Sequence, residues 1–533
     1  MIEFELDGRS VGVEDGQRSL LDALRDDLGV RSVKDGCSPQ GQCGCCTVWV
    51  DGAPRVACVT PTARIAGRTI TTIEGLDSAI GWAARFRAEG ATQCGFCTPG
   101  IIMRLASLDD AARATRAAVD KALLAHLCRC TGWQTIVAAA AGGPAATGVG
   151  TRDPSAATAR ALIEGRTTQQ VSSEVALGGG GFADDTAPAD ALVAVRRSDG
   201  EWLLGRTLTE ARRAAGKVQG RRTTAPAAWP IEVPDGSWAH TLRTTWVEPA
   251  YLEPDAAWCV PGGDPVSPLA NGGAFGGKVS SEVGDVARRL ADEHGRAVRV
   301  LYSREDTVVL GHKRPPLAVG TDRAGRGVAC VARPMDEADG VSIVEAVAAA
   351  APGIDVRFVD VPGPSVSGAL RAAVWAELAA LRCTAAAPTD AIAGVGPADA
   401  IIAPNGASAA AAIVDRQPQP GVSGGPAETV HVRVCCGRVL DDVVLRSYCI
   451  GAAHMALGMV RSEFLAVGDD GTPLDLTIRS FGVLRATDMP RVEVEIVPDD
   501  GPPLNGSDAV FAAVLAAAHR RAGTPDRWPL AAM

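Results

Sequence analysis

Apolar and polar positions alternate in short runs through about the first 60 residues, which is the pattern of β-strands. Residues 2–6 alternate, an Asp-Gly turn follows, and the alternation resumes to about Val13, which predicts a β-hairpin. Four leucines within residues 20–28 then recur at the spacing of one helix face. Two further strands are expected at Thr47–Val50 and Arg55–Val59, on either side of a second Asp-Gly turn. These segments predict a small sheet packed against one helix, an α+β arrangement.

The pattern changes to that of helices between about residues 77 and 141. A stretch rich in Ala, Gly, Pro and Thr follows, and this composition is typical of a linker. The rest of the chain mixes strand and helix patterns with many Gly and Pro turns, so we expect a mixed α/β region without an internal repeat. Four helices are expected between residues 77 and 141, at 80–86, Pro99–Leu105, Val119–Leu127 and Thr131–Ala140.

Length and charge narrow the classes of function. A chain of 533 residues is too long for one ordinary domain, so we expect three or four. The net charge of -10 argues against nucleic acid or an anionic membrane as a partner, because both select basic faces. The sequence begins without a signal-peptide pattern and has no uninterrupted apolar run of about 18 residues, so we expect a cytoplasmic protein.

The chain has fifteen cysteines, and eight of them form two tight groups. In the first group, Cys37, Cys43, Cys46 and Cys58 have the spacing C-x5-C-x2-C-x11-C. Plant-type ferredoxins hold a 2Fe–2S cluster with a similar loop of three cysteines and a distant fourth, although their first gap is one residue shorter. Cys45 lies between two of the expected ligands, and we expect it to point away. The alternative is a structural zinc site, which more often uses cysteines in closely spaced pairs.

The second group consists of Cys94 and Cys97, followed by Cys128 and Cys130. If the predicted helices form, each pair lies near the start of a helix. The helix dipole and the free N–H groups there favour thiolates and an anionic cluster. Taken alone, a C-x2-C with a C-x-C could also bind zinc. Beside the first group, a second 2Fe–2S cluster is the stronger interpretation.

Three segments around these cysteines resemble one known family. GQCGCCTV at 41–48, QCGFCTPG at 93–100 and HLCRCTGW at 126–133 resemble the iron–sulfur module of the xanthine dehydrogenase and aldehyde oxidase family of molybdenum hydroxylases. The resemblance implies a β-grasp ferredoxin domain followed by a four-helix cluster domain. It also implies that Gln93 and Cys130 lie near a pterin, and that electrons flow from molybdenum through the second cluster and then the first to an outside acceptor.

The remainder of the chain resembles the molybdopterin-binding subunit of that family, in a shortened and divergent form. GGAFGGK at 272–278 would cradle the pterin side of the cofactor, with Phe275 near the metal, and Arg371 in GALRAA is a further candidate. The cofactor would be a molybdopterin dinucleotide, of the cytosine form by resemblance to bacterial members. The cofactor-binding candidates are Gln93, Gly272, Gly273, Ala274, Phe275, Gly276, Gly277 and Arg371.

The resemblance also gives the expected domains. They are a plant-type 2Fe–2S ferredoxin domain at 1–74, a helical 2Fe–2S-binding domain at 75–142, a linker at 143–170, a reduced hammerhead-like segment at 171–240 and a shortened molybdopterin-binding-like region at 241–533. The flavin domain of fused members has no counterpart. We therefore expect a separate FAD-binding subunit or another electron acceptor as partner.

One departure bears on catalysis. The catalytic base of the family is a glutamate that deprotonates a metal-bound hydroxyl, and Gly501 stands where that glutamate belongs. Glycine cannot act as a general base. The neighbouring Asp500 could substitute only if the backbone shifted.

Two functions follow from these observations. In the first, the chain passes electrons from its own molybdopterin site through two 2Fe–2S clusters to an external acceptor, on an aldehyde or N-heterocycle substrate. In the second, it is a non-catalytic electron-transfer and assembly subunit with a degenerate molybdopterin domain, and a separate chain holds the catalytic metal. A zinc-bound structural protein is the third possibility.

Overall fold

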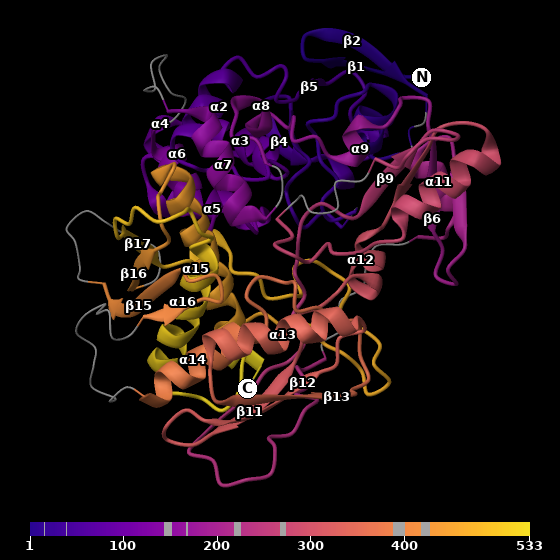
Figure 1. Cartoon of the computed structure of the whole chain (residues 1–533). Coiled ribbons are helices and arrows are strands. Elements are labelled where there is room, and N and C mark those ends of the chain that lie inside the picture. The colour runs from indigo at the N-terminus through magenta and orange to yellow at the C-terminus, as the bar shows by residue number, and fades with distance from the viewer. Residues whose placement is uncertain are drawn as a thin grey trace.

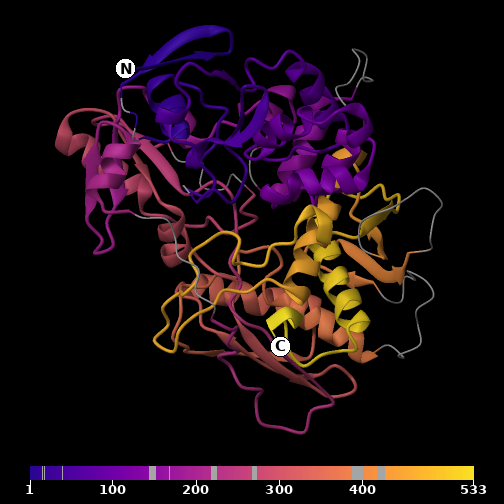
Figure 2. The ribbon, with the colours of Figure 1, turned by 180° about the vertical axis from the view of Figure 1, so that it is seen from behind.

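The computed structural model describes residues 1–532 apart from 15, 17, 39, 143–151, 167–168, 218–224, 267–272, 387–399 and 417–426. The N-terminal elements gather at one end of the molecule, and the long C-terminal helices form a second body beneath them (Figure 1). The same arrangement is seen from behind, where the residues near 180–215 and 256–310 form a flank beside both bodies (Figure 2).

The first body begins with a five-stranded sheet in the order β2-β1-β5-β3-β4. β1 pairs antiparallel with β2 and parallel with β5, which confirms the predicted hairpin. The fourth strand ends earlier than expected, because residues 57–59 form a 3-10 turn that carries Cys58. The three-residue β5 is too short to produce a readable alternation. The strands are β1 Ile2–Leu6, β2 Arg9–Val13, β3 Thr47–Val50, β4 Ala53–Val56 and β5 Thr69–Thr71, and the helix α1 Leu20–Asp22 continues as a π-turn over Ala23–Asp27.

A helical unit follows and matches the four expected helices, with one extra helical turn. Its core is aromatic, because Trp82, Phe86 and Trp133 are almost completely buried. Helix α3 begins directly after Cys97, which is its N-cap residue. The last helix begins three residues later than predicted, so Thr131 stays in the loop that carries Cys128 and Cys130. The helices are α2 Ala79–Ala88, α3 Thr98–Ala106, α4 Asp110–Arg113, α5 Arg116–Ala122 and α6 Gln134–Gly142.

Part of the stretch that we expected to be a linker is instead a packed helix, α7 Pro154–Gly165. Arg160 and Glu164 pair within it and are both fully buried, and α7 packs against the long helix α15 (Asp442–Arg461). Alanine and glycine are compatible with either a linker or a tightly packed helix, so composition misled the prediction. The short helices α8 Ser173–Ala176 and α9 Ala183–Thr186 follow.

The segment expected to be hammerhead-like does not form a sheet of its own. Strands β6 and β7 join β9 and β10 from further along the chain in the order β7-β6-β10-β9. Helix α11 packs on this sheet through Val283, Val286 and Leu290. The elements are β6 Leu192–Arg196, β7 Trp202–Gly205, α10 Leu208–Ala214, β9 Ala256–Cys259, α11 Val283–His294 and β10 Val298–Leu301.

Two four-stranded sheets and the longest helices make up the second body. The sheet orders are β13-β12-β11-β8 and β14-β15-β16-β17. Helix α15 passes between the cysteine-bearing loops and the C-terminal helix α16, and it is almost entirely buried. By length and composition it could cross a membrane, but with 89% of its apolar window buried it is a core helix in the described part of the chain. The elements are β8 His240–Arg243, α12 Arg304–Leu310, β11 Leu317–Thr321, β12 Gly327–Ala332, α13 Glu337–Ala350, β13 Ile354–Val359, α14 Trp375–Ala386, β14 Ile401–Ile402, β15 Ser408–Asp415, β16 Glu428–Cys435, β17 Arg491–Ile496 and α16 Ser507–Arg521.

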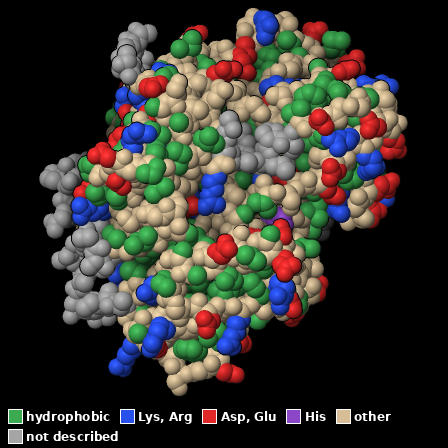
Figure 3. All heavy atoms as spheres, in the orientation of Figure 1, with side chains coloured by type: hydrophobic (Ala, Val, Ile, Leu, Met, Phe, Trp, Pro, Cys, Tyr) green, Lys and Arg blue, Asp and Glu red, His purple; other side chains and the backbone are tan. Residues whose placement is uncertain are grey.

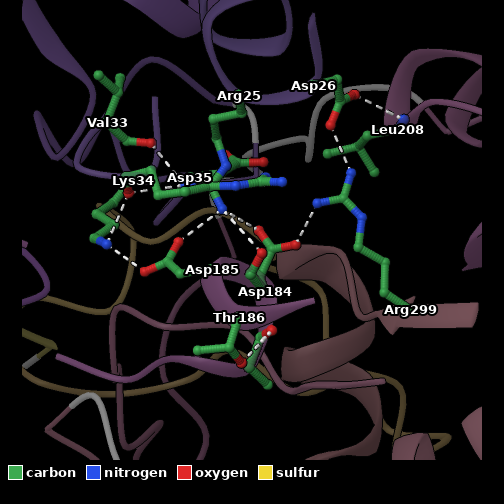
Figure 4. Close-up of polar contacts among 12 residues, drawn as sticks. Arg25, Asp26, Val33, Lys34, Asp35, Asp184, Asp185, Thr186, Leu208 and Arg299 are labelled. Carbon is green, nitrogen blue, oxygen red and sulfur yellow. Dashed lines mark hydrogen bonds and ion pairs between the residues drawn. The ribbon is translucent and has the colours of Figure 1, made fainter. Parts of the chain in front are cut away.

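A largely buried ionic network joins the helical turn and loop at residues 23–35 to the flank (Figure 4). The Arg25 guanidinium donates to Asp184 at 2.7 Å and to Asp185 at 2.8 Å, and Arg299 donates to Asp184 at 2.8 Å. Lys34 pairs with Asp185 from the other side. Burial alone would raise the pKa of Asp184, but the two guanidinium groups hold it below its usual value. The outer surface, by contrast, carries scattered charges of both signs (Figure 3).

Candidate metal centres

The four cysteines of the first group converge although they come from a loop and a separate turn. All four side chains are buried and none forms a disulfide. Hydrogen bonds from the Cys43 and Cys58 thiols lower the pKa of Cys37 well below its usual value, and Cys58 also contacts Cys46. Backbone amides face the sulfurs as well, because the Gln40 N–H donates to Cys37 Sγ at 3.1 Å. Converging thiols with amide donors suit an anionic iron–sulfur cluster.

Glycine is required where this loop folds around the sulfurs. A Cβ on Gly36 would lie 3.1 Å from Cys43 Sγ and 3.2 Å from Cys45 Sγ. Gly44 has a φ of +72°, and a Cβ there would lie 2.5 Å from the His126 ring. A side chain at Gly44 would clash with the His126 ring, and one at Gly36 would crowd the two sulfurs.

The second group also converges, from the start of α3 and the loop before α6. Cys130 Sγ lies 3.6 Å from Cys94 Sγ. The Cys97 thiol hydrogen-bonds to Cys128 and lowers the pKa of Cys128 to about 6, helped by the Thr131 hydroxyl at 3.2 Å. In the described part of the chain, no three His, Cys, Asp or Glu side chains converge on the position of a single metal ion. The thiols of the second group meet in two pairs instead, Cys94 with Cys130 and Cys97 with Cys128.

The loops that carry the two groups are in direct contact. The Leu127 N–H donates to the Cys43 carbonyl at 2.9 Å, and His126 Nε2 lies 3.1 Å from the Thr47 hydroxyl. Burial lowers the pKa of His126 to about 3, so this imidazole between the groups is neutral. Cys45 does not point away as expected, because its buried thiol hydrogen-bonds with that of Cys43. The short path between the groups suits electron transfer.

Several cofactor candidates are brought together beside the second group. A Cβ on Gly273 would lie 2.7 Å from Cys130 Sγ. The Arg371 N–H donates to the Phe275 carbonyl at 2.8 Å, and a Cβ on Gly276 would lie 1.8 Å from the Ala369 carbonyl oxygen. The loop therefore packs directly on the segment that carries Arg371. Of the other candidates, Ala274 and Gly277 close the loop through a 2.9 Å hydrogen bond, and Gly272 lies outside the described residues.

The space in front of this loop is filled by side chains. The Arg371 guanidinium stacks on the Phe275 ring at 3.8 Å, and the Tyr448 ring packs edge-on at 6.2 Å. Arg129 donates to both carboxylate oxygens of Glu463, at 2.6 and 2.7 Å. The cavity that remains has a volume of about 20 Å³. That is room for about one water molecule, whereas small-molecule sites occupy about 300–1,000 Å³.

Gln93 lies on the other side of Cys130 and is not part of this cavity. Its amide donates to the Cys130 carbonyl at 3.1 Å and to the Ser447 hydroxyl at 3.0 Å, and its Oε1 has no hydrogen-bond partner. It lines a separate opening of about 200 Å³, and none of the described residues around that opening is charged. A dinucleotide carries phosphates that need cationic or helix N-terminal partners. The cavity at Phe275 is too small for a molybdopterin dinucleotide, and the described residues around the opening at Gln93 offer its phosphates no cationic partner.

Gly501 and Asp500 lie away from the filled cavity, on an exposed turn. The Gly501 carbonyl accepts a hydrogen bond from the Arg438 N–H at 2.9 Å, and Asp500 is exposed. Neither lines the cavity at Phe275. Motif analysis missed three residues around this site, namely Arg129, Glu463 and Tyr448, because contacts with residues far away in the sequence place them there.

Comparison with known proteins supports the two cysteine groups. Residues 4–64 match the family described as 2Fe-2S iron-sulfur cluster binding domain, and residues 72–141 match the 2Fe-2S binding domain family. The nicotine 6-hydroxylase small subunit of Paenarthrobacter nicotinovorans is 42% identical over 147 residues, which is 27% of this chain and 88% of that one. The nicotinate dehydrogenase small FeS subunit of Eubacterium barkeri is 42% identical over 144 residues, covering 26% of this chain and 90% of that one.

The likeness to solved structures extends over the whole chain. The aldehyde oxidoreductase from Desulfovibrio gigas superimposes with a TM-score of 0.68 over 99% of both chains, at 16% identity. At that identity the match establishes a shared fold.

Proposed function

Because the chain belongs to the xanthine dehydrogenase and aldehyde oxidase family of molybdenum hydroxylases, we propose that it is a two-cluster 2Fe–2S electron-relay subunit whose C-terminal region is a scaffold. The observation that carries this proposal is a contrast within one structure. Two buried sets of four cysteines lie side by side, while the cavity at the family's cofactor loop has a volume of about 20 Å³. The second of the two functions predicted above is therefore the better supported.

In this proposal Cys37, Cys43, Cys46 and Cys58 hold the first cluster, and Cys94, Cys97, Cys128 and Cys130 hold the second. When bound, each cluster supplies reversible one-electron transfer. The protein contributes buried thiolates, N–H donors to sulfur and a dry contact between the two loops. These exclude water from the sulfurs and fix the distance between the groups.

If this chain holds no molybdenum cofactor, it needs partners that supply and accept electrons. A larger chain would hold the catalytic molybdenum, act on an aldehyde or N-heterocycle and supply electrons to the second group. A FAD-binding subunit or another acceptor would accept them from the first group. Two relatives are named as small subunits of a nicotine hydroxylase and a nicotinate dehydrogenase, which supports a role within a larger assembly.

Metal analysis of the anaerobically purified chain tests the proposal. We expect about four irons, four sulfides and no molybdenum or zinc in each chain. Cys43→Ser should lose the iron of the first group, whereas Cys45→Ser should keep all four irons because its thiol is buried beside the group without being a ligand. Zinc in place of iron, or one molybdenum in each chain, would overturn the relay proposal; molybdenum would point to a working hydroxylase.

A further inference from the structure

One arginine from the C-terminal region reaches the loop of the first cysteine group. Arg304 is 0% exposed. Its guanidinium donates to the carbonyls of Tyr251 and Leu252, both at 2.8 Å, and to the carbonyl of Gly36. Gly36 directly precedes Cys37, so a buried cation lies one residue from an expected ligand.

This cation has no neutralising partner. All three of its acceptors are uncharged carbonyls, Arg304 Nε has no hydrogen-bond partner, and no carboxylate lies within ion-pair distance among the described residues. The other buried charges beside Cys37 are paired, Lys34 with Asp185 and Asp35 with Arg212. Arg479 also donates to this loop, at the Gln42 carbonyl, but it is exposed, so water screens its charge.

The second cysteine group also has a buried arginine beside it, but the charge of that arginine is neutralised by a carboxylate. Arg129 lies between Cys128 and Cys130 and is also buried, but both oxygens of Glu463 neutralise it. Among the described residues, the buried arginine at the first group therefore lacks a carboxylate partner, whereas the one at the second group has one.

Stability of helix α12 does not explain the position of Arg304. It is the first residue of the helix, immediately after the N-cap Ser303, whose capping box with Asp306 fixes this turn. The positive end of the helix dipole disfavours a cation there. The arginine is held by its bonds to the carbonyls of residues 36, 251 and 252, which points to a role at the first cysteine group.

We propose that Arg304 is a positioning residue that raises the reduction potential of the cluster at the first group above that of the second. This inference rests on the proposed relay function. Reduction adds a negative charge to a cluster, and a nearby unpaired buried cation stabilises the reduced state. Electrons arriving at the second group would therefore settle on the first, next to the external acceptor.

The test is a redox titration of both clusters, followed by electron paramagnetic resonance, in the wild-type chain, Arg304→Gln and Arg304→Lys. We expect Arg304→Gln to shift the midpoint of the first cluster to a more negative potential and to leave the second unchanged. Arg304→Lys keeps the charge and should stay close to the wild type. An unchanged or more positive first midpoint in Arg304→Gln, with four irons present, overturns the inference. A merely structural role would loosen the loop and admit water, which stabilises the charged reduced state and shifts the midpoint upward.

If Arg304→Gln loses iron, the effect of an unpaired buried arginine is tested at the second group instead. Glu463→Gln frees the charge of Arg129 beside the second group, so the second midpoint should rise toward the first. An unchanged second midpoint in that variant overturns the inference. Failure of the relay proposal itself is seen separately, as a wild-type chain that contains no iron.

Discussion

The buried pair of Arg129 and Glu463 should be the strongest single link between the cysteine-bearing loops and the C-terminal region. The two guanidinium nitrogens donate at 2.6 and 2.7 Å, and the side chains are only 4% and 1% exposed. The residues are 334 positions apart in sequence. Loss of one partner leaves the other charge buried and unpaired, which destabilises proteins by about 3–5 kcal/mol. We therefore expect Glu463→Ala to lower the free energy of unfolding by about that amount.

Replacing both charges distinguishes charge from shape. In Arg129→Met with Glu463→Leu no charge remains to be buried, so most of the lost stability should return. The exposed pair of Arg326 and Asp322, whose side chains are 73% and 39% exposed, is the control. Arg326→Ala should cost about 0.5 kcal/mol or less, because water screens such pairs.

Urea unfolding followed by circular dichroism measures all three changes under one set of conditions. A Glu463→Ala variant within 1 kcal/mol of the wild type would show that the pair is hydrated. A double variant as unstable as the single one would show that the loss comes from packing around Gly458, which Glu463 covers, and that the charge argument is wrong.

Two further predictions rest on single residues. Burial raises the pKa of Glu253 to about 7 from its ordinary 4.5, although Lys278 at 2.9 Å opposes the rise. The folded state therefore holds this proton more tightly, and the resulting stability is full below pH 4.5 and is lost as the pH rises through about 7. The loss amounts to about 3 kcal/mol, and Glu253→Gln should abolish it in unfolding curves measured from pH 4 to pH 8; an unchanged pH slope would contradict the assignment. Gly273→Ala should lose the iron of the second group, because its Cβ would lie 2.7 Å from Cys130 Sγ, whereas Gly262→Ala, with a similar φ of +69° and open space around it, should keep all iron. Full iron in Gly273→Ala would show that Cys130 accommodates the added methyl group and that this contact does not control cluster binding.

The N-terminal part of the fold could be predicted because its signals are local. Apolar and polar residues alternate over the five residues of each hairpin strand. The cysteines of each group come from two short segments of the sequence, and the residues around them resemble those of a known family. The three-residue β5 and helix α7 could not be predicted in this way. The first is too short to show a period. The second is rich in alanine and follows a stretch rich in Gly and Pro, so composition did not separate it from a linker.

The filled cofactor site could not be predicted because every contact that fills it is distant in sequence. Arg371 is paired with Asp508 at 3.3 Å, and Tyr448 donates to Gln169 at 3.1 Å across 279 positions. No window of sequence contains both members of either pair. The motif GGAFGGK could be recognised in the sequence, but the sequence could not show whether a cavity lies in front of it.

Packing alone accounts for the glycines of that motif. Gly273 makes room for a cysteine sulfur, and Gly276 makes room for the Ala369 carbonyl, so both glycines are required even where no cofactor fits. Phe275 and Arg371 stack on each other and so stabilise the same junction. The motif therefore indicates the fold, whereas the free volume in front of it, about 20 Å³, supports the proposal that this chain holds no cofactor there.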